Sequence, residues 1–325
     1  MISLVITSIE PAAPLMWRNI KMFQELSLDV YVILDRQVEG LYPPPFINYR
    51  DPPDNEFERM CTFDSYSRKN IGYILAAKRN SNVLETDDDN LINAPLNFLN
   101  IDFETPRPAT EYVDTPNLFR DIYPDAIGCI WARGLPLEKR VNSQIISKVH
   151  EAKVGVVQFL VKGEPDVDAI YRLVLCDTSN IDINPDHMPI NLMNTFHPFN
   201  SQATYWPSKN LCLAYLPFTC SFRMTDIYRS FISQKILYSH GESVLFDHAV
   251  FTQQRNPHNI VGDFKSEWLG YVHVEKILAA VETVNFGSKQ DMLYECYRKL
   301  TNLDVFQKVE MATLEAYLKE VNPAH

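Results

Sequence analysis

The sequence predicts an α/β fold in which a Rossmann-type mixed sheet is flanked by helices and followed by a helical C-terminal tail. In the first third of the chain, strand-like and helical patterns alternate at residues 2–9, 14–26 and 30–34, which is the βαβ order of α/β proteins. The apolar run at 154–161 has the composition of a buried strand. After residue 267 only helical patterns follow, at 268–284, 290–300 and 305–321.

The elements between these segments follow from local signals. Prolines at 43–45 and 52–53 predict an extended surface loop. A helix is expected at 65–77, where Ser65 can cap its first turn. A short helix is expected at 166–175. A longer helix at 225–239 is followed by a strand at 243–251. Prolines, asparagines and aromatic residues crowd the stretch 184–218, which we expect to form packed loops over a site.

Composition excludes several classes of protein. The chain has 325 residues and a formal charge of -11, and without a basic stripe we expect no nucleic-acid partner. Six cysteines without a CxxC pair indicate free thiols in a reducing compartment, so we expect a cytoplasmic protein. No apolar run approaches the ~18 residues that cross a bilayer. We therefore expect no integral membrane segment, and either a soluble protein or the soluble catalytic region of a longer one.

Three consecutive aspartates, Asp87, Asp88 and Asp89, follow a short apolar run that predicts a buried strand. Ligands of open α/β sheets bind at the carboxyl ends of strands. Adjacent carboxylates repel one another unless a cation neutralises them, and carboxylate oxygens suit Mg²⁺ or Mn²⁺. The alternative is a solvated turn, which Asn90 and Pro95 would also favour.

Basic and polar residues near the triplet predict a site for an anionic nucleotide. Arg68 and Lys69 lie in the first turn of the expected helix, where the helix dipole disfavours cations unless an anion binds there. Asp35 ends the second strand and could bind a base or ribose, and Thr7 ends the first strand beneath the same nucleotide. For Arg68 and Lys69 the alternative is a surface pair bridged to Asp64. For Asp35 and Thr7 it is an ordinary cap or turn.

Together these features resemble the nucleotide-sugar domain of GT-A glycosyltransferases, and more specifically the STELLO family of glycosyltransferases. The stretches that carry the resemblance are SRKNIGY at 67–73, ETDDDN at 85–90, WARGLPL at 131–137, PDVDAIYRL at 165–173, PFNSQ at 198–202 and DIYRS at 226–230. The membrane anchor of the plant members has no counterpart in this sequence. The resemblance implies these divisions: a GT-A-like catalytic domain at 1–265, with a nucleotide-sugar half at 1–130 and an acceptor half at 131–265, and a helical extension at 266–325.

The resemblance also implies a metal-dependent transfer of a sugar from a nucleotide-sugar donor, for which we expect a UDP-sugar, to a carbohydrate or other hydroxyl acceptor. The last aspartate of a DXD motif commonly binds Mn²⁺ or Mg²⁺ and the first reaches the ribose or a metal-bound water, which nominates Asp89 and Asp87. Asp88 is expected to contact the donor. A third metal ligand late in the catalytic region would be His258.

An inverting transfer needs an acceptor-side carboxylate as general base. Asp226, at the start of the 225–239 helix, is the candidate and Asp247 the alternative, although an N-cap role would also explain Asp226. Arg223 or Arg229 is expected to hold Asp226 in place or to contact phosphate. The aromatic residues Phe199, Tyr205 and Trp206 could stack on a sugar ring, although core packing explains each of them as well. A second acidic pair, Asp166 and Asp168, is expected to lie at a helix start.

Two other functions stay open: a catalytically inactive GT-A-fold binding or assembly factor, and a nucleotidyltransferase. A nucleotidyltransferase usually has a glycine-rich phosphate loop near the first strand, and this sequence has none there. The helical tail packs on the core or forms a homodimer, and its apolar pattern does not distinguish these.

Overall fold

The computed structural model describes residues 1–175, 181–184, 186–256 and 259–321. Among them, one ten-stranded mixed sheet runs through the molecule in the order β3-β2-β1-β4-β9-β7-β6-β8-β10-β5. The strands are β1 (Ile2–Ser8), β2 (Asp29–Leu34), β3 (Phe46–Ile47), β4 (Asn82–Asp87), β5 (Asn90–Ile92), β6 (Arg107–Tyr112), β7 (Ile146–Lys162), β8 (Ile190–Leu192), β9 (Ala203–Trp206) and β10 (Glu242–Gln253).

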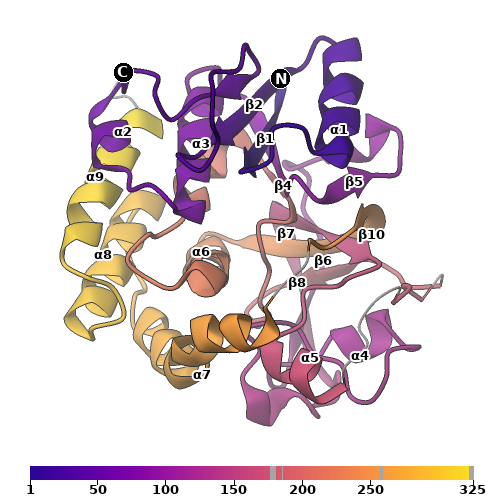
Figure 1. The fold of residues 1–325 in the computed structure, drawn as a ribbon. Coiled ribbons are helices and arrows are strands. Elements are labelled where there is room, and N and C mark those ends of the chain that lie inside the picture. The colour runs from indigo at the N-terminus through magenta and orange to yellow at the C-terminus, as the bar shows by residue number, and fades with distance from the viewer. Residues whose placement is uncertain (176–180, 185, 257–258, 322–325) are drawn as a thin grey trace.

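Helices flank the sheet, and the last three form a layer along one side (Figure 1). The α-helices are α1 (Pro14–Glu25), α2 (Glu56–Met60), α3 (Lys69–Ala77), α4 (Phe119–Ile122), α5 (Ala169–Leu175), α6 (Thr225–Ser239), α7 (Ile260–Glu282), α8 (Lys289–Asn302) and α9 (Val309–Val321). Short 3₁₀ turns are η1 (Tyr66–Arg68), η2 (Leu96–Leu99), η3 (Leu137–Lys139), η4 (Ser208–Ala214) and η5 (Phe222–Met224). The predicted fold class, a mixed sheet flanked by helices with C-terminal helices after it, is therefore confirmed.

The first four strands are parallel and place the candidate site. β1 pairs in parallel with β2 on one side and with β4 on the other, in a register that sets Thr7 opposite Asp87 and Ser8 opposite Leu34. The carboxyl ends of β1, β2 and β4 therefore lie at one edge of the sheet. Helix α3 lies against β1 at Gly72, where a Cβ atom would collide with the side chain of Val5.

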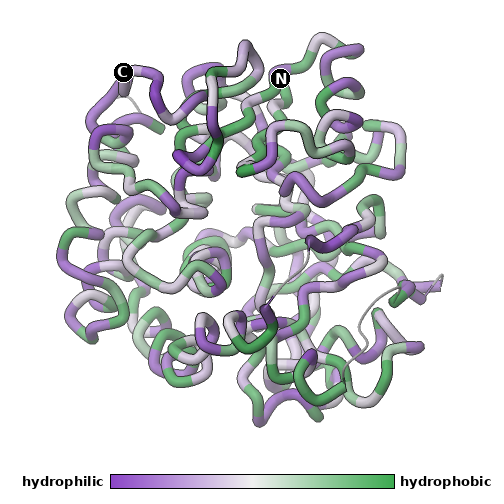
Figure 2. Tube along the Cα trace, viewed as in Figure 1, coloured by the Kyte–Doolittle hydropathy of each residue, from purple (hydrophilic) through white to green (hydrophobic). Residues whose placement is uncertain are grey.

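The second half of the sheet is built around β7, a longer strand than the sequence predicted. β7 pairs in parallel with β10 and antiparallel with β6 and β9. β9 joins the two halves, because it also pairs antiparallel with β4. Figure 2 shows hydrophobic residues along the central strands and mixed colours along the outer helices. Buried residues that alternate along β1 belong to two clusters, Val5 to one and Leu4 and Ile6 to the other, so the core lies on both faces of this sheet.

The C-terminal helices belong to the main hydrophobic core. Ile277 and Val281 of α7 are fully buried, whereas Val272 is 55% exposed. The carboxylate of Glu310, in α9, is buried and accepts hydrogen bonds from Tyr215 Oη at 2.6 Å and from the backbone N–H of Thr219 at 2.8 Å. Helix α9 is thereby fixed to the loop that leads into α6. The homodimer stays a prediction.

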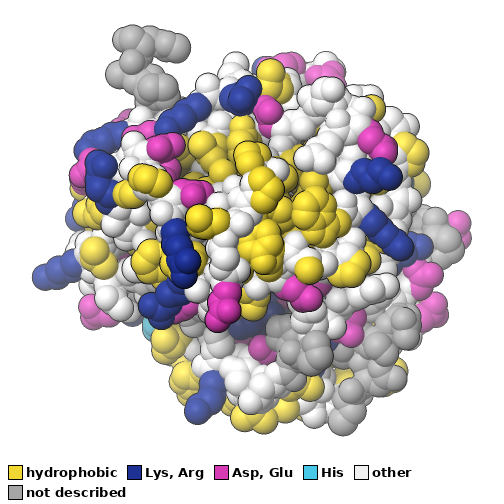
Figure 3. All heavy atoms as spheres, turned by 45° about the horizontal axis from the view of Figure 1, so that its top comes forward, with side chains coloured by type: hydrophobic (Ala, Val, Ile, Leu, Met, Phe, Trp, Pro, Cys, Tyr) yellow, Lys and Arg dark blue, Asp and Glu magenta, His cyan; other side chains and the backbone are white. Residues whose placement is uncertain are grey.

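The surface carries charges of both signs. On the face drawn in Figure 3, Lys and Arg side chains are interspersed with Asp and Glu, and hydrophobic side chains gather near its centre. The five cysteines in the described ranges are free, as the spacing predicted. No helix among the described residues is long and apolar enough to cross a membrane.

Candidate functional site

A cleft of about 840 Å³ opens at the edge of the sheet where β1, β2 and β4 end. Seven of the predicted site residues line it: Thr7, Asp35, Arg68, Asp87, Asp88, Asp89 and Asp226. The opposite wall comes from later parts of the chain and includes Arg133, Asp166, Asn200, Gln202, Arg223, Gln253 and Arg255. Residues from both 1–130 and 131–265 therefore line this cleft, and the division into a nucleotide-sugar half and an acceptor half stays a prediction.

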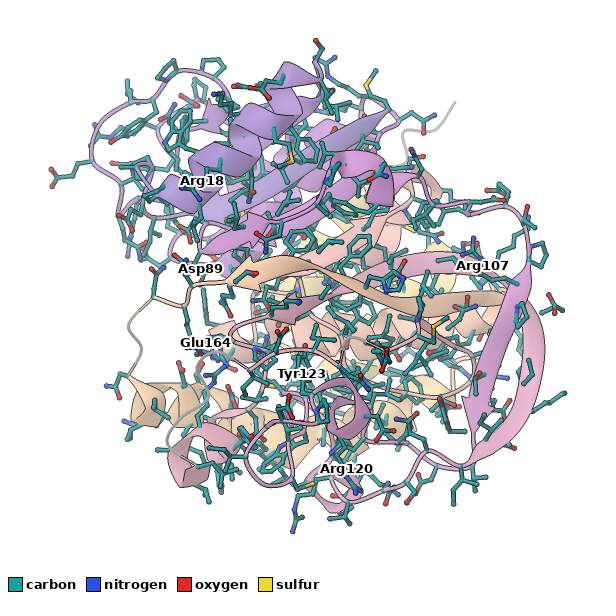
Figure 4. The ribbon with its side chains drawn as sticks, turned by 90° about the vertical axis from the view of Figure 1, so that its right-hand side faces the viewer. Arg18, Asp89, Arg107, Arg120, Tyr123 and Glu164 are labelled. Atoms are coloured by element: carbon teal, nitrogen blue, oxygen red, sulfur yellow. The ribbon has the colours of Figure 1, made fainter. Side chains whose placement is uncertain are left out.

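Each aspartate of the triplet is held by a different neighbour. Asp87 Oδ1 accepts hydrogen bonds from Lys69 Nζ and Tyr66 Oη, both at 2.7 Å. Asp88 Oδ2 accepts one from Ser8 Oγ at 2.6 Å. Asp89 Oδ2 accepts one from Gln253 Nε2 at 2.8 Å. In Figure 4, Asp89 lies beside the end of strand β10. The triplet is therefore not a freely solvated turn.

The triplet has more negative charge than its surroundings neutralise. Burial raises the pKa of Asp89 to about 7, and the neighbouring charge of Asp87 contributes in the same direction. Burial also raises the pKa of Asp88, although the hydrogen bond from Ser8 opposes it. Carboxylates with raised pKa values in a cleft indicate a site where a cation would be bound favourably.

The donor atoms fit a divalent cation that is shared with a ligand. The described residues contain no group of three or more His, Cys, Asp and Glu side chains that could hold a metal by themselves. Mg²⁺ is usually bound by one or two carboxylates together with water and substrate phosphates. The carboxylates of Asp87 and Asp89 fit that pattern, with phosphate oxygens supplying further ligands. His258 lies outside the described residues.

Lys69 is placed differently from what the sequence suggested, whereas Arg68 lies in the cleft. Lys69 is fully buried, and its ammonium group contacts Tyr66 Oη, Asp87 Oδ1 and the backbone oxygens of Thr86 and Ser201. These acceptors use all its N–H groups, so Lys69 points into the protein rather than toward a phosphate. Arg68 lines the cleft, 3.8 Å from Asp35 Oδ1, and its Nε has no hydrogen-bond partner among the described residues.

Asp35 lies at the end of β2 and organises the loops around it. Its Oδ1 accepts a hydrogen bond from the backbone N–H of Arg36 at 2.7 Å, and its Oδ2 accepts one from that of Ser65 at 3.2 Å. The turn role named as the alternative is therefore present. Asp35 and Thr7 both line the cleft, so the predicted contact with a nucleotide remains available to them.

Arg133 lies between two aspartates on the opposite wall. It forms two hydrogen bonds of 2.8 Å with Asp166 and two of 3.0 Å with Asp226. Burial alone would raise the pKa of Asp166, but the charge of Arg133 prevails and holds it well below its usual range. This Asp166–Arg133–Asp226 group, rather than Arg223 or Arg229, holds Asp226 in place.

Asp226 lies in the cleft as predicted, but its oxygens are fully engaged. Besides the bonds from Arg133, Oδ1 accepts the N–H of Ile227 at 3.0 Å and Oδ2 that of Ser201 at 3.2 Å. A carboxylate offers about four lone-pair sites, and four N–H groups occupy them. Its role as general base therefore stays a prediction that this geometry does not favour. Asp166 accepts three N–H groups, from Arg133 and Asn200.

The two arginines expected to hold Asp226 have other partners. Arg229 is buried and pairs with Glu85 at 2.8 Å. Arg223 pairs with Glu267 at 2.8 Å and also lines the cleft. Arg255, which no sequence pattern indicated, lines the cleft and binds Asp263 through Nη2 at 2.9 Å. Among the described residues, Nε and Nη1 of Arg255 have no hydrogen-bond partner.

Several other predicted residues lie away from the cleft. Asp247 accepts a hydrogen bond from the N–H of His248 at 2.7 Å and does not line the cleft in the described part of the chain. Phe199, Tyr205 and Trp206 are almost completely buried, so core packing, the alternative for each, is what the structure has. Asp168 accepts the N–H of Tyr171 at the start of α5 at 2.8 Å, as expected of a helix-start acid, whereas its neighbour Asp166 lies in the cleft.

The fold and the cleft together define a mixed α/β protein with an acidic ligand site at the carboxyl ends of parallel strands. Within that class, residues 223–322 match the family model described as STELLO glycosyltransferases. The chain is similar to the Arabidopsis thaliana proteins named Probable glycosyltransferase STELLO2, at 28% identity over 232 residues, and Probable glycosyltransferase STELLO1, at 27% over 199. The resemblance to STELLO glycosyltransferases is thus confirmed.

These similarities cover limited parts of the proteins. The matches span 65% and 55% of this chain but only 28% of STELLO2 and 25% of STELLO1. Among solved structures, a mycobacterial protein is similar over 93% of this chain and 74% of its own, with a TM-score of 0.39 and 10% sequence identity.

Proposed function

We propose that this protein is a metal-dependent glycosyltransferase that moves a sugar from a nucleotide-sugar donor, most simply a UDP-sugar, to the hydroxyl group of a carbohydrate or other acceptor. The observation that supports this proposal is the cleft itself. It joins an incompletely neutralised aspartate triplet, at the ends of three parallel strands, to a wall of arginine and carboxylate groups. The similarity to STELLO glycosyltransferases supports the same class of chemistry.

The donor would lie across the ends of β1, β2 and β4. Thr7, Asp35, Arg68 and Asp88 line the cleft and are available to the donor. Asp87 and Asp89 would bind Mn²⁺ or Mg²⁺, which when present supplies positive charge to the departing diphosphate. Arg255 is close enough to Asp89 to affect its pKa. Its free N–H groups would therefore bind the same diphosphate, in the role first expected of Lys69.

The acceptor would approach from the Asp166–Arg133–Asp226 wall. In the transfer, the acceptor oxygen forms a bond to the anomeric carbon while the bond from that carbon to the diphosphate oxygen breaks, and the diphosphate keeps the electron pair. The acceptor proton passes to a base. Asp166 has one lone-pair site left after its bonds to Arg133 and Asn200, so we assign the contact with the acceptor hydroxyl to Asp166 and the positioning of that wall to Asp226.

Calorimetric titration with UDP, in the presence and absence of Mn²⁺, tests the donor site, and hydrolysis of a panel of nucleotide sugars tests the chemistry. We expect UDP to bind only when Mn²⁺ is present and at least one donor to be hydrolysed. Binding without hydrolysis of any donor would favour the inactive binding factor. Pyrophosphate release from a nucleoside triphosphate would favour the nucleotidyltransferase. If neither UDP nor Mn²⁺ bound, the proposal would be refuted.

A further inference from the structure

Lys69 is a buried cation whose contacts need an explanation. Its side chain is fully inaccessible to solvent, and its ammonium group contacts four oxygen atoms at 2.7 to 3.2 Å. Burying a charge is costly unless it is paired and hydrogen-bonded. Its one charged partner is Asp87, the first aspartate of the triplet. A lysine at this position therefore fixes Asp87 and is not available to a ligand.

Tyr66 contacts the same oxygen of Asp87 from a second direction. Its hydroxyl donates to Asp87 Oδ1 at 2.7 Å and accepts hydrogen bonds from Lys69 Nζ at 2.7 Å and from Ser201 Oγ at 2.6 Å. With Oδ1 held by two donors, the carboxylate group cannot rotate freely.

The other oxygen of Asp87 is left for a ligand. Among the described residues, Oδ2 has no hydrogen-bond partner, and the side chain is 26% exposed on the wall of the cleft. We propose that Tyr66, Lys69 and Ser201 form a clamp that holds Asp87 Oδ1 against the protein and directs Oδ2 to the divalent cation. This makes Tyr66 and Lys69 positioning residues. The inference rests on the proposed function, because it takes Asp87 as a metal ligand.

The clamp also connects the two walls of the cleft. Lys69 contacts the backbone oxygen of Ser201 at 3.2 Å, and the N–H of Ser201 donates to Asp226 Oδ2 at the same distance. Ser201 lies between Asn200 and Gln202, which both line the cleft. A displacement of Asp87 would therefore be transmitted to the wall that carries Asp226, so the clamp also sets the spacing between the metal ligands and the acceptor side.

Substitution of Tyr66 by Phe tests the clamp without changing any charge. The variant removes one hydroxyl and keeps the ring, which packs edge-on against Phe222. Loss of a residue that orients a metal ligand typically lowers metal affinity by about 10- to 100-fold. We expect Tyr66→Phe to weaken Mn²⁺ binding, measured by titration calorimetry with Mn²⁺ alone and with Mn²⁺ plus UDP, by at least about tenfold.

Tyr73→Phe is the matched control. Tyr73 is a buried tyrosine of the neighbouring helix α3, and its hydroxyl donates to Glu85, a carboxylate on the same strand as Asp87. Like Tyr66→Phe, this variant loses one buried hydrogen bond of a tyrosine hydroxyl. In the described part of the chain, however, the Tyr73 hydroxyl makes no hydrogen bond to the aspartate triplet. We expect it to bind Mn²⁺ with the affinity of the wild type, and comparing the melting temperatures of the two variants separates instability from a local loss of binding.

Substitutions of Lys69 provide a second measurement. Lys69→Met removes a positive charge beside the triplet, which by electrostatics alone would strengthen Mn²⁺ binding, whereas loss of the clamp weakens it. We expect weaker binding, partly restored in Lys69→Arg. Wild-type Mn²⁺ affinity in Tyr66→Phe, or tighter binding in Lys69→Met, would overturn the clamp. If the wild type itself bound no Mn²⁺, the proposed function would fail instead.

Discussion

The buried ion pair between Glu85 and Arg229 allows a quantitative test of how the site is supported. Glu85 is fully buried on β4, and Arg229 of α6 is 1% exposed. Glu85 accepts hydrogen bonds from Arg229 Nη1 and Trp206 Nε1, at 2.8 and 2.9 Å, and from the hydroxyl of Tyr73. Removing one partner of such a pair costs about 3–5 kcal/mol, because the other charge stays buried without compensation.

Glu85→Gln preserves the shape of the side chain and removes its charge. Arg229 keeps its hydrogen bonds to the backbone oxygens of Asn200 at 2.9 Å and Ala214 at 3.5 Å. We therefore expect the loss in unfolding free energy to fall near the lower end of that range, at about 3 kcal/mol. Urea denaturation followed by circular dichroism measures it.

The double variant Glu85→Gln/Arg229→Met is the control for this prediction. It removes both charges, so we expect it to be less destabilised than the sum of the two single variants. A loss below about 1 kcal/mol in Glu85→Gln, the level of an ordinary hydrogen bond, would refute the reasoning that an uncompensated buried charge dominates.

Three further predictions concern binding and pH. Asp89→Ala should abolish Mn²⁺-dependent UDP binding in calorimetry; unchanged affinity would remove the metal assignment. Arg255→Met should weaken UDP binding about tenfold while leaving binding of Mn²⁺ alone nearly unchanged, and an equal loss of both would contradict a role at the diphosphate. Burial lowers the pKa of His197 to about 3. Below about pH 6.5 the unfolded chain therefore binds a proton at His197, and the folded chain does not. For this reason the free energy of unfolding falls by about 1.4 kcal/mol for each unit by which the pH is lowered between pH 6 and 4. The melting temperature of His197→Gln should fall less steeply over that range, and parallel curves would contradict the assignment.

Sequence reasoning located the side of the cleft that β1, β2 and β4 form, because its signals are local. Parallel strands bring their carboxyl ends to one edge, so residues that follow those strands meet whatever the rest of the fold does. Asp35, Thr7 and the aspartate triplet were found in this way. The direction of Lys69 was not predictable, because a place in the first turn of a helix does not say whether a side chain faces solvent or the sheet.

The opposite wall could not be predicted from local signals. Arg133 contacts Asp166 and Asp226 across 33 and 93 residues of sequence, and no spacing rule relates them. Strand β9 was missed because all four of its residues are buried and show no alternation of polar and apolar side chains. The motif stretches at 131–137 and 198–202 were the available signal for Arg133 and Asn200, but they did not indicate which side chains face the cleft.

The attachment of Glu310 has a practical consequence for shortened versions of this protein. A chain truncated near residue 305 would lose the carboxylate that accepts the hydroxyl of Tyr215 and the N–H groups of Phe218 and Thr219. That loop precedes η5 and α6, which carry Arg223 and Asp226 on the acceptor wall. Deleting helix α9 would therefore impair the proposed sugar transfer from a distance, even though none of its residues lines the cleft.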